Sequence, residues 1–243
     1  MNGPMAPIYR LGLVASTMDE LHAMAQDGAA AGTAVVAEEQ VGGRGSRGRI
    51  WLSPPGGLWL SVLLRPTSAS GLDLLSLRAG LAVSRVLSAM LVGEPVRLKW
   101  PNDLMLADRK VGGILCEARW QGESLGWVVV GIGLNVTNPV PEALQGIATN
   151  LTARLPGVAA ADLVEPMVAA VEGTESESAR LGPEELARFG ELDWLWGRRL
   201  GSPAAGVAAG IAADGALRVR LAEGREVMLR AGPVELADSP VRA

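Results

Sequence analysis

The first strong pattern of apolar positions is helical and lies in STMDELHAMAQDG, residues 16–28. Its apolar side chains recur at helical spacing, at Leu21, Met24 and Ala25. Thr17 is placed to cap the first turn, and Glu20 reaches back in a capping box. Gly28 is placed to close the C-terminal end. The pattern therefore predicts a short helix that begins with a Thr17 cap.

A longer helix is predicted from Leu72 to Val92. Apolar residues recur there with the period of an amphipathic helix that packs on a sheet: Leu75, Ala79, Ala82, Val83, Val86 and Met90. Two further helical stretches are predicted at about 160–180 and 184–195.

Short apolar or alternating runs between the helices predict strands. In PVRLKW, for example, Val96, Leu98 and Trp100 alternate with two basic residues. The predicted strands lie at residues 32–40, 56–66, 95–100, 110–120 and 125–136. Because tight Gly or Asn-Asp connections join many of them, we expect an α+β fold with a mixed, largely antiparallel sheet and helices on one face.

The kind of predicted secondary structure changes after residue 195. Only short strands are predicted there, at 204–212, 215–222 and 225–232. The pairs Asp214-Gly215 and Glu223-Gly224 are typical of hairpin turns. The sequence thus predicts a main domain over residues 1–195 and a small appended β-barrel over residues 196–243.

Charge and cysteine content narrow the function classes. Acidic and basic residues number 26 and 22, for a formal charge of −4, which argues against nucleic acid as the main partner but leaves room for one local basic site. The single cysteine, Cys116, excludes an internal disulfide framework and fits a reducing compartment. Neither a signal peptide nor a membrane span is evident, so we expect a cytoplasmic protein without membrane partners.

The run QVGGRGSRGRIW, residues 40–51, concentrates glycine and arginine. Such a run can be a flexible basic tether, a nucleic-acid contact, or an ordered loop around an anion, since glycine lets main-chain N–H groups approach a phosphate. Predicted strands hold both of its ends. This placement favours an ordered loop.

Three further segments place polar groups at predicted strand ends. KWPNDLML offers Asn102 and Asp103, DRKVGGILCE offers Lys110 before Gly112-Gly113, and GIGLNV offers Asn135 within an apolar run. Each has an ordinary structural alternative: a Pro-Asn-Asp turn, a solvated lysine before a bulge, and an asparagine bonded to core backbone. Together they suggest one site.

Other familiar chemistries are absent from the sequence. The lone histidine, His22, falls near the polar side of its predicted helix, so a surface or capping role is favoured over that of a general base. One histidine and one cysteine do not make a zinc site. Neither a Walker loop nor a GxSxG elbow occurs.

The segments GRGSRGRIW, KWPNDL, KVGGIL and GIGLNV, in this order, resemble the biotin–protein ligase family, and STM matches the family's STN imperfectly. The resemblance extends from about Tyr9 to Leu236. It implies a catalytic sheet domain over residues 1–195 that binds biotin and ATP, and a Src-homology-3-like β-barrel over residues 196–243. Some members carry an N-terminal DNA-binding domain. Because fifteen residues precede Ser16, we expect a monofunctional ligase without a DNA partner.

The family's activity gives the expected substrates and partner. Biotin reacts with ATP to give biotinyl-5′-AMP and pyrophosphate, with Mg²⁺ as the expected metal. A lysine of a biotin carboxyl carrier domain then takes the biotinyl group. Cations and N–H donors would carry most of this catalysis, so no enzyme nucleophile is required.

The resemblance also implies roles for individual residues. The expected catalytic groups are Lys110, Arg44 and Asp103, with Lys110 bridging the biotin carboxylate and the α-phosphate. The groups expected at the biotin ureido ring are Ser16, Thr17 and Gln40. Those expected around the biotin tail and the adenylate are Gly43, Arg44, Gly45, Ser46, Gly112 and Gly113. Those expected on the nucleotide side are Arg49, Trp51, Asn102 and Asn135. The expected magnesium ligands are Asp103 and Asn135. Asp103 is alternatively a candidate to deprotonate the acceptor lysine.

Two positions depart from the family pattern. Met18 stands where the family has the asparagine of STN, which removes one polar contact. Ser46 stands where the family has the second arginine of G-R-G-R-x-G-R, and a serine does not supply its bidentate charge. Two outcomes follow as alternatives. Either Arg47 takes over the role through a local shift, or the adenylate is held loosely and leaks.

Several alternatives stay open on the sequence alone. A lipoate–protein ligase shares the catalytic fold. A nucleic-acid module would use the basic loop, and a ligase-like scaffold without activity would fit the changes at Ser46 and Met18. The sequence also leaves open the identity of the acceptor protein and a homodimer formed by edge-strand pairing. Closure of the loop over biotin from a disordered state is a further hypothesis.

Overall fold

A seven-stranded sheet forms the larger part of the computed structural model, which describes residues 6–91, 93–174 and 178–237. Its strands run in the order β1-β2-β3-β7-β6-β5-β4. Only the β1–β2 pair is parallel, so the predicted mixed, largely antiparallel sheet is confirmed. The strands are β1 (Ile8–Val14), β2 (Ala34–Gln40), β3 (Leu58–Leu64), β4 (Arg97–Lys99), β5 (Asp103–Leu106), β6 (Arg109–Gln121) and β7 (Ser124–Leu134).

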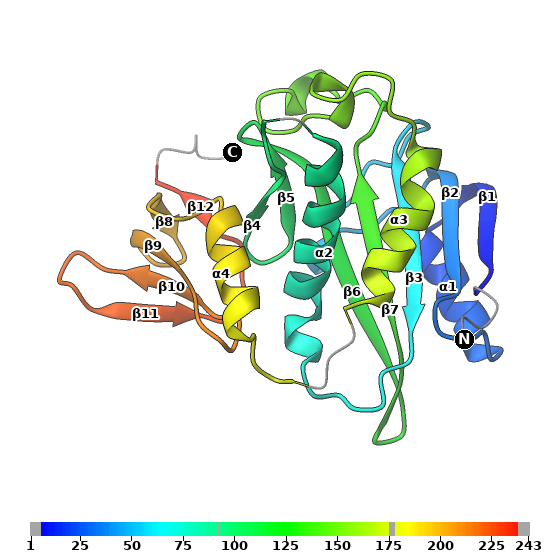
Figure 1. Cartoon of the computed structure of the whole chain (residues 1–243), viewed down its shortest axis with the longest axis horizontal. Coiled ribbons are helices and arrows are strands. Elements are labelled where there is room, and N and C mark those ends of the chain that lie inside the picture. The colour runs from blue at the N-terminus through cyan, green and yellow to red at the C-terminus, as the bar shows by residue number, and fades with distance from the viewer. Residues whose placement is uncertain (1–5, 92, 175–177, 238–243) are drawn as a thin grey trace.

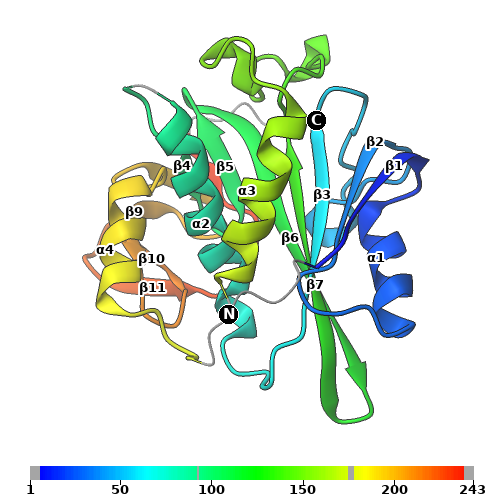
Figure 2. The ribbon, with the colours of Figure 1, turned by 45° about the vertical axis from the view of Figure 1, so that its right-hand side comes forward.

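Helices cover both faces of this sheet, not one face as predicted (Figures 1 and 2). Helices α2 (Leu75–Met90) and α3 (Ala160–Glu172) pack on one face, and α1 (Thr17–Gln26) packs on the other. Strand β3 shows the reason, because it is buried on both sides. Its residues Leu60 and Val62 belong to the core under α2 and α3, whereas Leu63 belongs to the core under α1. A strand buried on both faces needs a helix on each.

The predicted start of α1 is wrong by one residue. The N-cap is Ser16, whose Oγ accepts a hydrogen bond from the Met18 N–H at 3.3 Å. The Thr17 side chain is thereby left to bond elsewhere, as described below. At the other end Gly28 adopts φ +92°, the left-handed conformation that glycine tolerates best, as the sequence predicted.

The remaining helices are shorter than predicted. Helix α3 ends at Glu172 and α4 spans Pro183–Leu192. Part of the predicted 160–180 helix, residues 175–177, lies outside the described residues. None of the helices in the described ranges combines the length and apolar character needed to cross a bilayer. The short 3₁₀ turns are η1 (Ser46–Gly48), η2 (Leu72–Leu74), η3 (Glu142–Leu144) and η4 (Leu151–Ala153).

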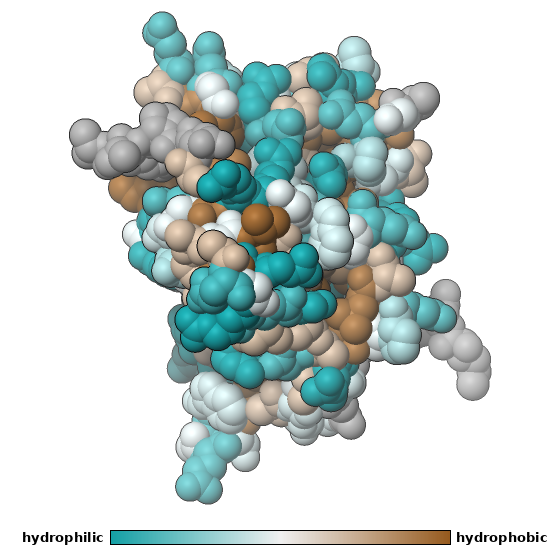
Figure 3. All heavy atoms as spheres, turned by 90° about the vertical axis from the view of Figure 1, so that its left-hand side faces the viewer, coloured by the Kyte–Doolittle hydropathy of each residue, from teal (hydrophilic) through white to brown (hydrophobic). Residues whose placement is uncertain are grey.

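A second, five-stranded antiparallel sheet follows α4, in the order β11-β10-β9-β8-β12. The sequence predicted its three consecutive hairpin strands, β9, β10 and β11, and missed β8 and β12. The recorded pairings leave β11 and β12 as edges, so they describe a sheet and not a closed barrel. Hydrophobic side chains on this side of the molecule are scattered among hydrophilic ones (Figure 3). Its strands are β8 (Arg199–Ser202), β9 (Gly206–Ile211), β10 (Leu217–Arg220), β11 (Glu226–Leu229) and β12 (Glu235–Leu236).

The two sheets share one hydrophobic core. Leu200 and Leu217 of the second sheet belong to the same buried cluster as the inner face of α2. The Trp100 indole donates to the Gly215 carbonyl at 2.9 Å. A Cβ at Gly215 would lie 2.6 Å from Leu74 Cδ2, so the β9–β10 turn fits closely against the residues that lead into α2. The second sheet is therefore fixed against the first.

Asp193 gives this junction a pH dependence. It is fully buried, its Oδ1 accepts from the Leu195 N–H at 2.8 Å, and burial raises the pKa of its carboxyl to about 6. A raised acid pKa favours the protonated folded state, so its stabilising effect is lost as the pH rises through 6. We expect the free energy of unfolding of the wild type, relative to Asp193→Asn, to increase by about 1 kcal/mol from pH 7 to pH 5. Urea unfolding at both pH values measures this, and an unchanged difference would contradict it.

Candidate active site

A cavity of about 740 Å³ is lined by the C-terminal ends of β2 and β7, by the N-terminal half of β6 and by residues of the 40–51 loop. It brings together residues from all four sequence segments and from the start of α1. The predicted site residues that line it are Ser16, Thr17, Gln40, Arg44, Gly45, Ser46, Arg49, Trp51, Asn102, Lys110, Gly113 and Asn135. Three predicted residues do not line it: Gly43, Asp103 and Gly112.

The glycine- and arginine-rich loop is an ordered hairpin in this structure. The Gly45 N–H donates to the Arg49 carbonyl at 2.7 Å, and the Trp51 N–H donates to the Gly43 carbonyl at 2.9 Å. Arg47 at its tip adopts φ +63°. These bonds match the ordered loop that its position between two strands favoured, and they differ from a flexible tether.

One group of side chains at the cavity consists of neutral polar residues that bond to one another. The Gln40 Oε1 accepts from the Thr17 N–H at 2.9 Å and lies 3.1 Å from the Thr17 Oγ. The Gln40 Nε2 donates to Ser53 Oγ at 2.8 Å, and Thr17 Oγ lies 2.8 Å from Ser61 Oγ. The sequence predicted Thr17 and Gln40 but missed Ser53 and Ser61, because only the folded sheet brings these hydroxyls to the pair.

A second group at the cavity contains Lys110 and Trp51. The Lys110 Nζ lies 2.5 Å from Asp103 Oδ1 and 5.0 Å from the centre of the Trp51 ring. Such an ammonium over an indole face is an attractive pair. The buried Trp51 Nε1 has no hydrogen-bond partner among the described residues. Gly133 makes room for this indole, because a Cβ there would lie 2.7 Å from its Nε1.

Two predicted glycines have packing roles here. A Cβ at Gly112 would lie 2.8 Å from the Gly133 carbonyl, so this glycine permits close pairing of β6 and β7. A Cβ at Gly43 would lie 2.4 Å from the Trp51 carbonyl, so this glycine permits the hairpin to close. Neither faces the cavity.

The two predicted magnesium ligands do not fit a resident metal site. Asp103 already faces the Lys110 ammonium. The Asn135 amide is engaged on both sides: Nδ2 donates to the Thr149 carbonyl at 3.0 Å, and Oδ1 accepts from Asn138 Nδ2 at 3.1 Å. Within the described ranges, no cluster of three or more His, Cys, Asp or Glu side chains is suited to hold a metal ion. Mg²⁺ usually binds through one or two carboxylates together with substrate phosphates.

Ser46 has a partner inside its own loop. The Arg49 Nη2 donates to Ser46 Oγ at 2.9 Å, and Arg49 Nε donates to the Ser46 carbonyl at 3.2 Å. Arg47 does not line the cavity, and its Nη2 lies 3.7 Å from the position of a Cβ at Gly232 in the second sheet's region. In this structure Arg47 therefore does not occupy the place of the expected arginine.

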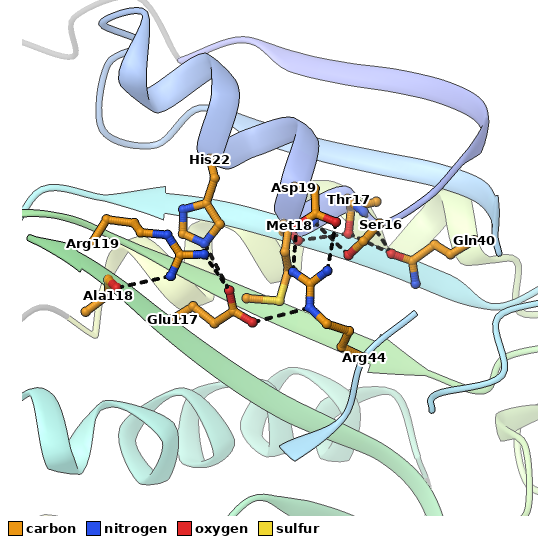
Figure 4. A network of polar contacts seen from close by, with 11 residues as sticks. Ser16, Thr17, Met18, Asp19, His22, Gln40, Arg44, Glu117, Ala118 and Arg119 are labelled. Carbon is orange, nitrogen blue, oxygen red and sulfur yellow. Dashed lines mark hydrogen bonds and ion pairs between the residues drawn. The ribbon is translucent and has the colours of Figure 1, made fainter. Parts of the chain in front are cut away.

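His22 is buried, which corrects the predicted surface or capping role. Its exposed fraction is 8%, and its ring lies between Trp127 of β7 and Glu117 of β6. Helical periodicity placed it near the polar side, but α1 lies against the sheet closely enough to cover that side too. Figure 4 shows His22 and Arg44 on either side of Glu117, a group that the sequence analysis did not select.

Comparisons with known proteins identify relatives of this chain. The model of the Biotin/lipoate A/B protein ligase family matches residues 12–135. The Biotin--[acetyl-CoA-carboxylase] ligase of Mycobacterium tuberculosis is 34% identical over 236 residues, which cover 90% of this chain and 85% of that protein. The Bifunctional ligase/repressor BirA of Bacillus spizizenii is 37% identical over 145 residues, 58% of this chain and 44% of that protein. The chain thus matches about half the length of the bifunctional relatives.

A solved structure resembles the whole chain. The biotin protein ligase from Aquifex aeolicus in complex with biotin and ATP has a TM-score of 0.78 and 29% sequence identity. The likeness covers 96% of this chain and 99% of the Aquifex chain. It therefore includes both sheets.

Proposed function

The chain belongs to the Biotin/lipoate A/B protein ligase family, and from this premise we propose that it is an ATP-dependent biotin–protein ligase. The observation that carries the proposal is a cavity lined both by the neutral polar groups of Thr17, Gln40 and Ser53 and by Lys110 beside Trp51. A ureido ring is neutral and needs paired donors and acceptors when buried, whereas an adenylate is anionic and planar. Biotinyl-5′-AMP has both parts in one molecule.

In the first step a biotin carboxylate oxygen forms a bond to the α-phosphorus of ATP, and the bond to the bridging oxygen breaks to release pyrophosphate. Thr17 and Gln40 hold the ureido ring, and Gln40 is already oriented by the Thr17 N–H and Ser53. Lys110 faces the carboxylate and α-phosphate oxygens, where negative charge accumulates. Preorganised cations stabilise such charge without reorganisation.

In the second step the neutral amine of an acceptor lysine attacks the biotinyl carbonyl carbon, AMP leaves with the electron pair of the broken bond, and the proton released from the nitrogen passes to water. The acceptor is a lysine of a biotin carboxyl carrier domain. Asp103 lies beside Lys110, at 2.5 Å from its Nζ, and orients it in both steps. Mg²⁺ enters with ATP as part of the substrate, bound to its phosphates.

We also propose that the two sheets belong to two domains. Residues 1–195 bind biotin and ATP, and residues 196–243 form the smaller β domain. The grouping of β1–β7 and β8–β12 into separate sheets supports this division. A cytoplasmic location is supported by the free Cys116 thiol, and a homodimer through β1 by its position at the sheet edge.

Biotin-dependent exchange of labelled pyrophosphate into ATP tests the proposed activity. We expect exchange with biotin and none above background with lipoate. Exchange driven by lipoate alone would favour the lipoate ligase alternative. Exchange with neither acid would contradict acyl-adenylate formation.

Ser46 is expected to make the chain release part of its biotinyl-5′-AMP. A serine supplies no bidentate charge, and Arg47 lies outside the cavity wall. Incubation of enzyme, biotin and ATP with a bystander protein should therefore label that protein above the level seen with Lys110→Ala. The variant Ser46→Arg should reduce this labelling. Wild-type labelling equal to that of Lys110→Ala would contradict the prediction.

A further inference from the structure

Helix α1 contributes Thr17 and Met18 to the cavity wall. Met18 is 4% exposed, and a Cβ at Gly131 of β7 would lie 2.9 Å from its Sδ, so this glycine makes room for the thioether. Further along the helix, Leu21 and Ala25 belong to the same apolar core as Met18. Apolar burial is not directional, so these contacts alone do not fix where the helix lies along the sheet.

His22 adds directional bonds from the same buried face of α1. The Trp127 indole, which only donates, gives its N–H to His22 Nδ1 at 2.9 Å. Because Nδ1 accepts, the ring proton is on Nε2, which lies 3.2 Å from Glu117 Oε2 and donates to it (Figure 4). His22 and Trp127 are 8% and 6% exposed. One buried ring therefore bonds α1 to both β6 and β7.

The charge of Glu117 agrees with this assignment of the ring proton. The hydrogen bond from His22 lowers the pKa of the Glu117 carboxyl to about 2, against the opposing effect of burial, and the charges of Arg44 and Arg119 lower it further. At neutral pH the carboxylate is therefore ionised and accepts the Nε2 proton. A hydrogen bond to an ionised acceptor is stronger than one between neutral groups. Sliding or rotation of α1 would break this bond or the bond from Trp127.

The steric contact and the hydrogen bond lie on matching faces of the two elements. Met18 and His22 are four positions apart on α1, and Gly131 and Trp127 are four positions apart on β7. Residues at these spacings share one face of a helix and one face of a strand. We propose that His22 is a positioning residue that sets the register of α1 on the sheet and so holds Thr17 and Met18 at the cavity. The part of these two residues in biotin binding rests on the proposed function.

NMR of the untagged, full-length chain tests the positioning role without any assay of activity. The chain has one histidine, so its imidazole nitrogens give a single set of signals. In mildly alkaline buffer we expect Nε2 to carry the proton and Nδ1 to carry none. A proton on Nδ1 would contradict the bond from Trp127 and with it the proposal.

The backbone amide of Thr17 reports whether His22 acts on the cavity. Its N–H donates to Gln40 Oε1 at 2.9 Å, so a displaced helix changes its surroundings. We expect His22→Leu, which removes both bonds of the ring, to shift the Thr17 amide signal. Gln26→Leu, a polar-to-leucine change at an exposed position of α1, is the matched control and should leave that signal in place. An unshifted Thr17 signal in His22→Leu would overturn the proposal.

Pyrophosphate exchange separates positioning from a loss of folded protein. We expect His22→Leu to raise the KM for biotin roughly fivefold, the scale of effect of lost hydrogen bonds, with kcat and the KM for ATP within about twofold of the wild type. His22→Gln keeps a donor and an acceptor and should recover most of the affinity for biotin. A loss of folded protein alone would lower kcat and leave both KM values unchanged, and that pattern would count against the proposal.

The two sets of measurements also distinguish this proposal from the proposed function. A wild type without biotin-dependent exchange would contradict the proposed function, whereas the expected NMR results would still support the positioning role of His22. An active wild type whose Thr17 signal does not respond to His22→Leu would contradict the positioning role alone.

Discussion

Replacing Lys110 by alanine is expected to reduce biotin-dependent pyrophosphate exchange by roughly 10²–10³-fold, the usual effect of removing one preorganised group at a developing charge. Lys110 is the lysine of the cavity wall, and its Nζ lies between the Asp103 carboxylate and the Trp51 ring. Removing it leaves Asp103 to repel the carboxylate and the α-phosphate. Steady-state exchange at saturating biotin and ATP measures the effect, which should appear mainly in kcat.

Arg109 supplies the matched control for Lys110. It is the neighbouring residue on β6 and also a cation, but its Nη1 lies 3.4 Å from the Gln145 carbonyl and it does not line the cavity. Arg109→Gln should therefore retain exchange within about twofold, because surface changes usually have small effects. Equal losses for both variants would show that the charge of this strand, and not the position of Lys110, matters.

Replacing Gly43 by alanine is expected to reduce exchange by roughly 10- to 100-fold, since small displacements of positioned groups cost up to about 10²-fold. The new Cβ would lie 2.4 Å from the Trp51 carbonyl and 2.5 Å from Ser53 Oγ. The hairpin must shift to avoid this contact with backbone, and Trp51 and Ser53 shift with it. Both line the cavity. Kinetics with biotin and ATP varied separately measure the change.

The fold should survive this change, because the hairpin is a surface loop. We expect the thermal unfolding midpoint of Gly43→Ala to remain close to that of the wild type. Gly146→Ala is a suitable control, since a Cβ there meets no atom within 4 Å and Gly146 does not line the cavity. Full activity of Gly43→Ala would contradict the close fit of the loop against Trp51.

Local patterns predicted the elements that local forces determine. The period of apolar residues located α2, and the alternation in PVRLKW was confirmed by the burial of Val96, Leu98 and Trp100. The parallel edge strand β1 was missed because its pairing with β2 spans the whole of α1, and its side chains are mostly exposed. The second face of the sheet was missed for a similar reason. Which helix covers which face depends on contacts between distant segments.

In the candidate site too, the residues within sequence motifs were predicted, and those that depend on distant contacts were missed. The motifs located Thr17, Gln40 and Lys110, all of which line the cavity. The two carboxylates that contact Arg44 were not predicted, because Asp19 and Glu117 are 98 positions apart and each looks like an ordinary surface carboxylate. His22 was misplaced because its burial comes from Trp127, 105 positions away. Ser46 was singled out from the sequence as a departure from the family pattern, but its bond with Arg49 required the folded hairpin.

Transfer of biotin to a biotin carboxyl carrier domain tests the central claim most directly. The purified chain would be incubated with biotin, Mg-ATP and the carrier domain, and the carrier's intact mass and modified residue would be determined by mass spectrometry. The account predicts one biotinyl group on the carrier's acceptor lysine with the wild type and almost none with Lys110→Ala. A carrier that stays unmodified with the wild-type chain, under conditions where a known biotin ligase modifies it, would contradict the account.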